Sequence, residues 1–162
     1  ARMKGPVYIR TARPKTAQVT AEETPFAIGK SVRLRPGDDV TIIACGVMVE
    51  AALEAAGDLA SGGIAAGVID MHTIKPLDAQ AVMAAARSTG ALVTAEEHSV
   101  LGGLGSAVAE ATAGQCPVPV EMVGIRDRFG QSGEPVELLR KYGLAPEDIC
   151  KAAKRAVSRK KG

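Results

Sequence analysis

Short apolar runs of strand length alternate with segments of helical periodicity along most of this chain, and this alternation constrains the fold more than any single motif. Most of the runs are continuously apolar, which is typical of strands that are covered on both faces. The runs lie at residues 40–44, 64–69, 91–95 and 118–123. Because helical segments separate them, the sequence predicts an α/β protein: a three-layer α/β/α domain with a mostly parallel sheet of about five strands.

The segments between these runs carry residues that favour helix ends. Asp78 stands where a side chain can cap the first turn of a helix, and Pro146 suits the first position of another. In the first expected helix, the carboxylates of Glu50, Glu54 and Asp58 share one side and predict a solvated face. The expected helices cover residues 49–61, 78–88, 104–113, 134–142 and 146–157.

The beginning of the chain differs from the rest. Residues 7–9 form a short apolar run that ends in a basic stretch, and residues 15–24 are polar and without periodicity. Such a polar segment is typical of a connector rather than of a packed unit. The sequence therefore predicts a short strand at 7–9, then a linker, then a folded domain that begins near Phe26.

Composition excludes several classes of function. The chain has 162 residues and a formal net charge of +2, which is too small to predict nucleic acid as a partner. No stretch approaches the roughly 20 apolar residues of a membrane span, and the first residues hold no apolar signal-peptide core. The three cysteines are far apart and form no CxxC pair, so neither a disulfide framework nor a zinc site is expected. These observations favour a cytoplasmic protein with no membrane partner.

The run from Glu96 to Gly105 joins acidic, imidazole and glycine residues directly after a predicted strand. Open α/β sheets place their sites at the carboxyl ends of strands. The glycines allow close backbone approach, and the free N–H groups of the next helix can hold an anion or a carboxylate. Glu96 and Glu97 point to opposite sides of a strand, so they do not predict a paired-carboxylate acid/base site. His72 and His98 lack the spacing of metal ligands.

Six motifs in this order resemble the C-terminal end of transketolase and its relatives, and they extend over essentially the whole chain. They lie at residues 5–14, 26–30, 39–46, 69–78, 96–98 with the glycines that follow, and 142–144. Relatives that share this domain include deoxyxylulose-phosphate synthase and the beta-type chains of 2-oxo acid dehydrogenases. The loop at 72–78 and the turn at 96–98 look most like transketolase.

The resemblance implies an enzyme that uses thiamine diphosphate and Mg²⁺ to transfer a two-carbon ketol unit between sugar phosphates. In that family, α/β domains follow one another and two subunits build each active site. Residues 1–25 look like the last strand of the preceding pyrimidine-binding domain plus a linker, and residues 26–162 look like the C-terminal domain. The family's Gly-Asp-Gly motif is absent. We therefore expect a structural, dimer-supporting chain that binds no cofactor or metal and catalyses nothing alone.

The partners implied by the resemblance are the remaining transketolase domains or a separate N-terminal subunit, in a homodimer. Arg13 occupies the position that resembles an arginine binding the substrate phosphate, and Arg10 has a similar, weaker resemblance. A guanidinium suits this role because it offers paired donors to a phosphate. Other candidate residues have structural or interface roles, namely Glu97, His98, Gly103 and Gly105.

Two alternatives belong to other classes of function. The first is a stand-alone domain that senses a small molecule or nucleotide at the carboxyl edge of the sheet. The second is a partner-docking module of a 2-oxo acid dehydrogenase-like complex. A ligand that stabilises the isolated chain would distinguish the sensor from a supporting domain.

Overall fold

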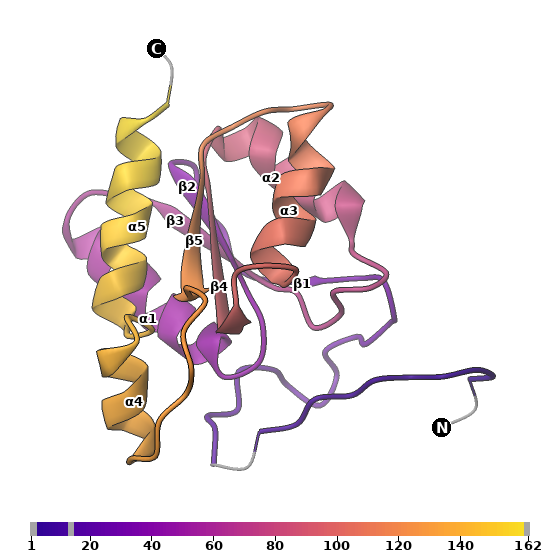
Figure 1. Cartoon of the computed structure of the whole chain (residues 1–162). Helices are drawn as coiled ribbons and strands as arrows, with labels where there is room; N and C mark the ends of the chain where they lie inside the picture. The colour runs from indigo at the N-terminus through magenta and orange to yellow at the C-terminus, as the bar shows by residue number, and fades with distance from the viewer. Residues whose placement is uncertain (1–2, 13–14, 161–162) are drawn as a thin grey trace.

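A five-stranded sheet lies at the centre of the protein, in a computed structural model that describes residues 3–12 and 15–160 (Figure 1). The strands have the order β1-β3-β2-β4-β5. All neighbours are parallel except β1 and β3, which are antiparallel. The strands are β1 (Val32–Arg35), β2 (Val40–Ala44), β3 (Ala66–Asp70), β4 (Leu92–Ser99) and β5 (Val120–Ile125). The predicted mostly parallel sheet is thereby confirmed.

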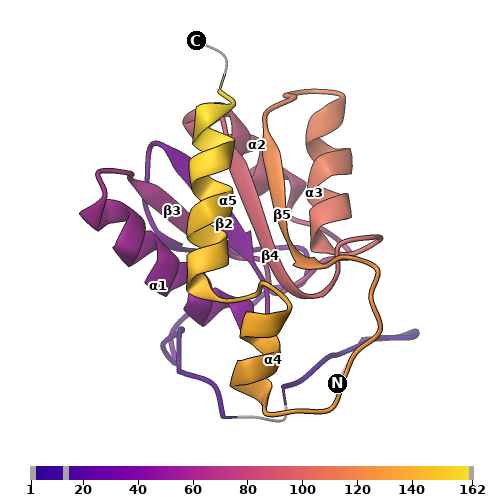
Figure 2. The ribbon, with the colours of Figure 1, turned by 60° about the vertical axis from the view of Figure 1, so that its left-hand side comes forward.

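Helices cover both faces of the sheet, which confirms the predicted three layers. Figures 1 and 2 show α1 and α5 together on one face and α2 and α3 together on the other. The side chain of Ile42 packs in the core under α1 and α5, whereas its neighbour Ile43 packs with α2 and α3. This explains why the runs in the sequence are continuously apolar. The helices are α1 (Met48–Ser61), α2 (Ala79–Thr89), α3 (Leu104–Ala113), α4 (Pro135–Lys141) and α5 (Pro146–Ser158).

The helix ends follow local chemistry where the sequence predicted it. Asp78 is the N-cap of α2, and its Oδ1 accepts a hydrogen bond of 3.2 Å from the backbone N–H of Ala81. The other oxygen, Oδ2, accepts from the backbone N–H of Ser31 at 2.9 Å. Gly90 ends α2 in a left-handed conformation with φ of 65°. Pro146 is the first residue of α5, where the missing N–H breaks no helical bond.

Two strands differ from the expectation. β1 was not predicted, because its four residues carry two arginines and the strand is only half-buried at the edge of the sheet. Basic residues on an edge strand discourage pairing with another chain. β4 continues to Ser99, beyond the expected end at residue 95, so the three residues Glu96, Glu97 and His98 lie within the strand. Its ladder with β5 resumes at Ser99 and Ile125 after an irregularity.

The N-terminal segment, described at residues 3–12 and 15–31, contains no helix or strand. The strand expected at 7–9 is therefore not formed within this chain. Tyr8 and Ile9 are 86% and 77% exposed, because nothing else in the described chain covers them. The segment passes the carboxyl ends of the strands before it enters β1 (Figure 1). None of the helices formed by the described residues is long and apolar enough to cross a membrane.

Candidate functional site

The carboxyl ends of three neighbouring strands bring polar side chains to one edge of the sheet. Cys45 follows β2, Asp70 ends β3, and Glu97 lies near the end of β4. Burial raises the pKa of Asp70 above its usual range, and the nearby imidazole of His72 acts in the opposite direction. This edge is where the sequence located its candidate site.

Glu96 is fully buried and serves the fold. One carboxylate oxygen accepts a hydrogen bond of 2.7 Å from the backbone N–H of Leu104, and the other accepts one of 2.8 Å from Gly105. These donors belong to the first turn of α3, where N–H groups lack helical partners. The free end of the helix thus holds a carboxylate from the same chain. Because Glu96 is fully buried and both of its oxygens contact α3, it is not placed to act on a substrate.

Gly103 and Gly105 allow the close packing around that carboxylate. A Cβ atom on Gly103 would lie 2.0 Å from Oε2 of Glu96, and one on Gly105 would lie 2.8 Å from Sδ of Met122. At Gly103 the backbone oxygen of Ser99 would also lie 2.6 Å from the Cβ atom, so a methyl group there requires the backbone to shift, whereas at Gly105 the side chain of Met122 would have to move. The two glycines therefore let α3 approach β4 and β5 closely enough for the Glu96 hydrogen bonds to form.

Glu97 points out of the sheet and binds Arg10 of the N-terminal segment. Nη2 of Arg10 lies 2.6 Å from Oε2 of Glu97, and Nη1 donates a hydrogen bond of 2.8 Å to the Glu97 carbonyl oxygen. The two side chains are 47% and 43% exposed. A guanidinium has five N–H donors, and these contacts use two of them. The pair therefore fixes the guanidinium at the edge of the sheet and leaves donors for a further acceptor.

The remaining candidates are not gathered around that pair. His98 is exposed, and its Nδ1 lies 3.0 Å from the carbonyl oxygen of Ser99. His72 stacks on Phe26 with ring centroids 4.5 Å apart, and its two ring nitrogens are buried without a hydrogen-bond partner in the structure. Arg13 lies outside the described residues.

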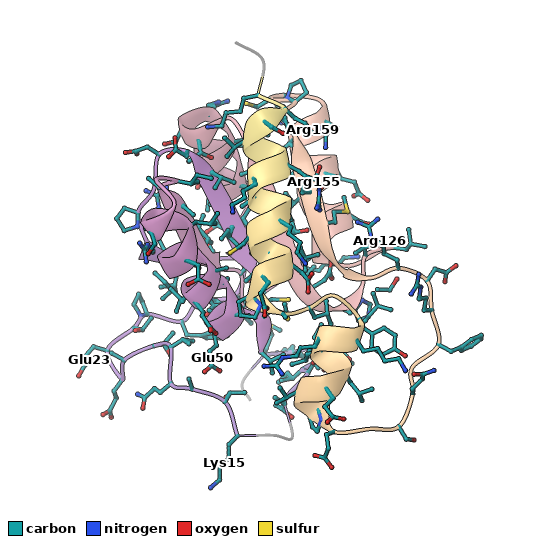
Figure 3. The ribbon with its side chains drawn as sticks, turned by 90° about the vertical axis from the view of Figure 1, so that its left-hand side faces the viewer. Lys15, Glu23, Glu50, Arg126, Arg155 and Arg159 are labelled. Atoms are coloured by element: carbon teal, nitrogen blue, oxygen red, sulfur yellow. The ribbon has the colours of Figure 1, made fainter. Side chains whose placement is uncertain are left out.

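Sequence reasoning missed two features of this edge. Burial, together with the charge of Glu96, raises the pKa of Cys45 to about 12, so the thiol is neutral and is no nucleophile at neutral pH. Glu50, expected on a solvated helix face, accepts a hydrogen bond of 3.4 Å from the backbone N–H of Ala17. A shallow pocket of about 240 Å³ lies there, between the start of α1 and the N-terminal segment. Figure 3 shows Glu50 close to that segment. A contact across 33 residues leaves no local signal in the sequence.

The site offers no set of metal ligands. Across residues 3–12 and 15–160, no group of three or more His, Cys, Asp or Glu side chains is placed to hold a metal ion. The arrangement instead combines a buried helix cap with an exposed, partly satisfied arginine.

Comparison with known proteins identifies the fold. A family model described as transketolase, C-terminal domain, matches residues 29–149. The chain is 49% identical to a 6-deoxy-6-sulfo-D-fructose transketolase subunit of Clostridium sp. (strain MSTE9), over 96% of this chain and 48% of the relative. It is 44% identical to an apulose-4-phosphate transketolase subunit of Phocaeicola vulgatus, over 91% of this chain and 47% of the relative.

A solved structure shows the same arrangement of strands and helices. It is described as a split gene transketolase in an inactive beta4 tetramer, and it superposes with a TM-score of 0.89 at 48% sequence identity. The match covers 92% of this chain and 49% of that one. The chain thus spans about half the length of the relatives that it matches.

Proposed function

This chain belongs to the transketolase family, as its C-terminal domain, and on that basis we propose that it completes an enzyme that transfers a two-carbon ketol unit between sugar phosphates. Its part in that enzyme is to support the preceding domain and to extend the dimer interface. The observation that carries the proposal is the anchoring of Arg10 on Glu97, which fixes the N-terminal segment to the carboxyl edge of the sheet.

The division of the chain belongs to the same proposal. Residues 1–25 are the end of a preceding pyrimidine-binding domain plus a linker, and residues 26–162 are the C-terminal domain. The exposure of Tyr8 and Ile9 supports this division, because an apolar run without a neighbour suits a strand that pairs with another domain. Limited proteolysis of the isolated chain should cut between residues 15 and 24 and leave the C-terminal domain intact.

The transketolase family is a family of thiamine diphosphate enzymes, but the described residues of this chain do not fit that cofactor with its Mg²⁺. Magnesium held beside a diphosphate needs at least one or two available carboxylates. At the carboxyl edge, Glu96 is bound to α3, Glu97 is bound to Arg10, and Asp70 is buried with a raised pKa. We therefore assign no catalytic residue to this chain.

Substrate phosphate is the ligand that we propose for Arg13, with Arg10 as a second donor. The remaining N–H donors of Arg10 and its two contacts with Glu97 support this role. Glu97, His98, Gly103 and Gly105 have structural or interface roles. For the glycines, the contacts that a Cβ atom would make with Glu96 and Met122 support the structural role.

The partner that we propose is a separate N-terminal subunit, or the remaining domains of a longer chain, in a homodimer. Relatives named as transketolase subunits support this partner. A cytoplasmic location completes the proposal and agrees with three free cysteines. Neither the family match nor the relatives favour a stand-alone sensor or a docking module.

Reconstitution tests the proposed function. The purified chain is mixed with the protein that supplies the cofactor-binding domains, and ketol transfer between sugar phosphates is measured in the presence of thiamine diphosphate and Mg²⁺. We expect neither component to be active alone and the mixture to form product. Calorimetry of the isolated chain with the cofactor and Mg²⁺ should show no saturable heat. Activity that is unchanged when this chain is omitted would contradict the proposal.

A further inference from the structure

A basic pocket lies between β5, α4 and α5, and its lining residues do not include Arg10 or Glu97. Its volume is about 310 Å³. Figure 3 shows Arg126 at the end of β5 and Arg155 on α5. Side chains from the loop after β5 and from the end of α4 complete the lining. The charged lining residues of this pocket are Arg126, Arg128, Lys141, Asp148, Lys151 and Arg155.

Positive charge is concentrated there far beyond the average of the chain. The whole chain has 20 basic and 18 acidic residues, whereas five of the six charged lining residues are basic. Asp148 pairs with Lys151 at 3.0 Å, and its Oδ2 also accepts a hydrogen bond from the backbone N–H of Ala145. A second carboxylate, that of Glu121 beside the lining, pairs with Arg155. Three of the five cations remain, so the pocket has a surplus of positive charge.

Three of the cations have no carboxylate partner within the part of the chain that the structure describes. Arg126 donates a hydrogen bond of 3.3 Å to the Met122 carbonyl oxygen, and no salt bridge is formed by Arg128 or Lys141. These three side chains are exposed, so water weakens their mutual repulsion, and an anion between them would interact favourably with all three. The guanidinium groups of Arg126 and Arg128 can thus donate paired hydrogen bonds to such an anion, and the ammonium group of Lys141 adds a compact positive charge.

The loop that carries two of these cations is held in an unusual conformation. Asp127 has φ of 45°, a left-handed conformation that residues other than glycine adopt rarely. With Asp127 in this conformation, Arg126 and Arg128 both line the same pocket. The hydroxyl of Tyr142 donates a hydrogen bond of 2.9 Å to the Phe129 carbonyl oxygen, which ties the loop to the end of α4.

The side chain of Arg155, which lines the pocket from α5, is held in place by an ion pair. Glu121 on β5 accepts from Nε of Arg155 at 3.0 Å and from Nη1 of Arg159 at 2.6 Å. Burial alone would raise the pKa of Glu121, but the two arginines outweigh it and lower that pKa. Because Glu121 binds Arg155 through Nε, the terminal nitrogens of Arg155 are free of that contact.

We propose that this pocket binds a diphosphate group, either free or as part of a nucleotide. Arginines give paired hydrogen bonds to phosphate oxygens, and lysine adds a compact charge. A volume of about 310 Å³ is at the lower end of small-molecule pockets and suits a compact anion. The lining residues include neither Arg10, Glu97 nor Glu96, so the proposed diphosphate site uses other side chains than the proposed phosphate site of Arg10 and Arg13.

Calorimetric titration of the whole chain with inorganic pyrophosphate tests this proposal. Ionic strength is held constant with NaCl, so that general screening does not imitate binding. We expect saturable binding that Arg128→Gln/Lys141→Gln weakens by about tenfold or more, because two charge-assisted contacts are lost. The matched control Arg140→Gln/Lys154→Gln removes the same charge from exposed residues outside the lining and should change the affinity by less than about threefold.

A titration with ADP identifies the source of the diphosphate, and folding measurements control for misfolded variants. Tighter binding of ADP than of pyrophosphate identifies a nucleotide, and equal binding identifies the free anion. Circular dichroism and thermal unfolding confirm that each variant is folded, and Arg126→Gln replaces the double variant if that variant is unfolded. Absence of saturable pyrophosphate binding, or an equal loss in the two double variants, would overturn the proposal.

Discussion

Glu96 and Glu97 are neighbours in β4, yet they act in opposite ways. Glu96 points into the protein and binds two backbone N–H groups of α3, whereas Glu97 points outward and binds a side chain of the N-terminal segment. The first contact is buried and uses groups that have no other partner. The second is about half-exposed and competes with water. Alternation along a strand therefore separates a residue that maintains the fold from one that joins the domain to another segment.

The largest expected effect follows from removing the buried member of this comparison. Glu96→Ala leaves the N–H groups of Leu104 and Gly105 without acceptors in a buried site. We expect the free energy of unfolding to fall by about 3–5 kcal/mol, because hydrogen bonds to charged groups contribute about 1.5–3 kcal/mol each. Urea denaturation measures the change. A loss below about 1 kcal/mol would show that water or another group replaces the carboxylate.

Filling the space beside Glu96 should have the next largest effect. In Gly103→Ala the new methyl group would overlap Oε2 of Glu96 at 2.0 Å, so the cap must move. We expect a loss of about 2–4 kcal/mol in the free energy of unfolding, as for other overpacked buried sites. Gly57→Ala is the matched control, since a Cβ there meets nothing within 4 Å and α1 favours alanine by about 0.5–1 kcal/mol. Equal effects of the two substitutions would contradict a role for close packing.

The pH dependence of stability sharpens the electrostatic side of the comparison. Burial first, and then the charge of Glu96, raises the pKa of Cys45 from 9.0 to about 12 in the folded protein. The unfolded chain therefore releases the thiol proton at lower pH than the folded chain. This contribution to stability is complete below pH 9 and is lost as the pH rises from 9 toward 12.

A comparison with Cys45→Ala isolates that contribution. Between pH 8 and pH 10.5, the free energy of unfolding of the unmodified protein should fall more steeply than that of the variant, by roughly 2 kcal/mol in total. Urea denaturation at several pH values measures both slopes. Parallel slopes would mean that the Cys45 thiol ionises as readily in the folded protein as in the unfolded chain.

The sequence predicted the features that depend on neighbours along the chain. The continuous apolar runs indicated the covered sheet, and Asp78 and Pro146 marked helix ends because capping is a local interaction. β1 was missed because a short edge strand with two arginines has little apolar signal. The extension of β4 to Ser99 depends on its pairing with Ile125, which local residues do not encode.

The sequence indicated which edge of the sheet carries the candidate site, but not which side chains contact one another there. The glycine turn indicated the carboxyl edge, and the free N–H groups of α3 indicated an acceptor. The pairing of Arg10 with Glu97 joins residues 87 positions apart, so no local pattern could reveal it. Cys45 gave no signal either, because its raised pKa arises from burial and from the charge of Glu96, a residue on another strand.

The smallest expected effect on stability belongs to the exposed member of the comparison. In a double-mutant cycle with Arg10→Ala and Glu97→Ala, the coupling free energy should be about 0.2–1 kcal/mol, because a half-exposed ion pair is screened by water and salt. The larger consequence concerns the N-terminal segment, which the pair holds against β4. Glu97→Ala should therefore speed proteolytic cleavage between residues 15 and 24 and leave the cleavage rate in the C-terminal domain unchanged. The control Glu110→Ala, on the exposed face of α3, should leave both cleavage rates unchanged. A coupling free energy above about 2 kcal/mol, or a cleavage rate that Glu97→Ala leaves unchanged, would contradict the view that Glu96 maintains the fold while Glu97 only holds the N-terminal segment.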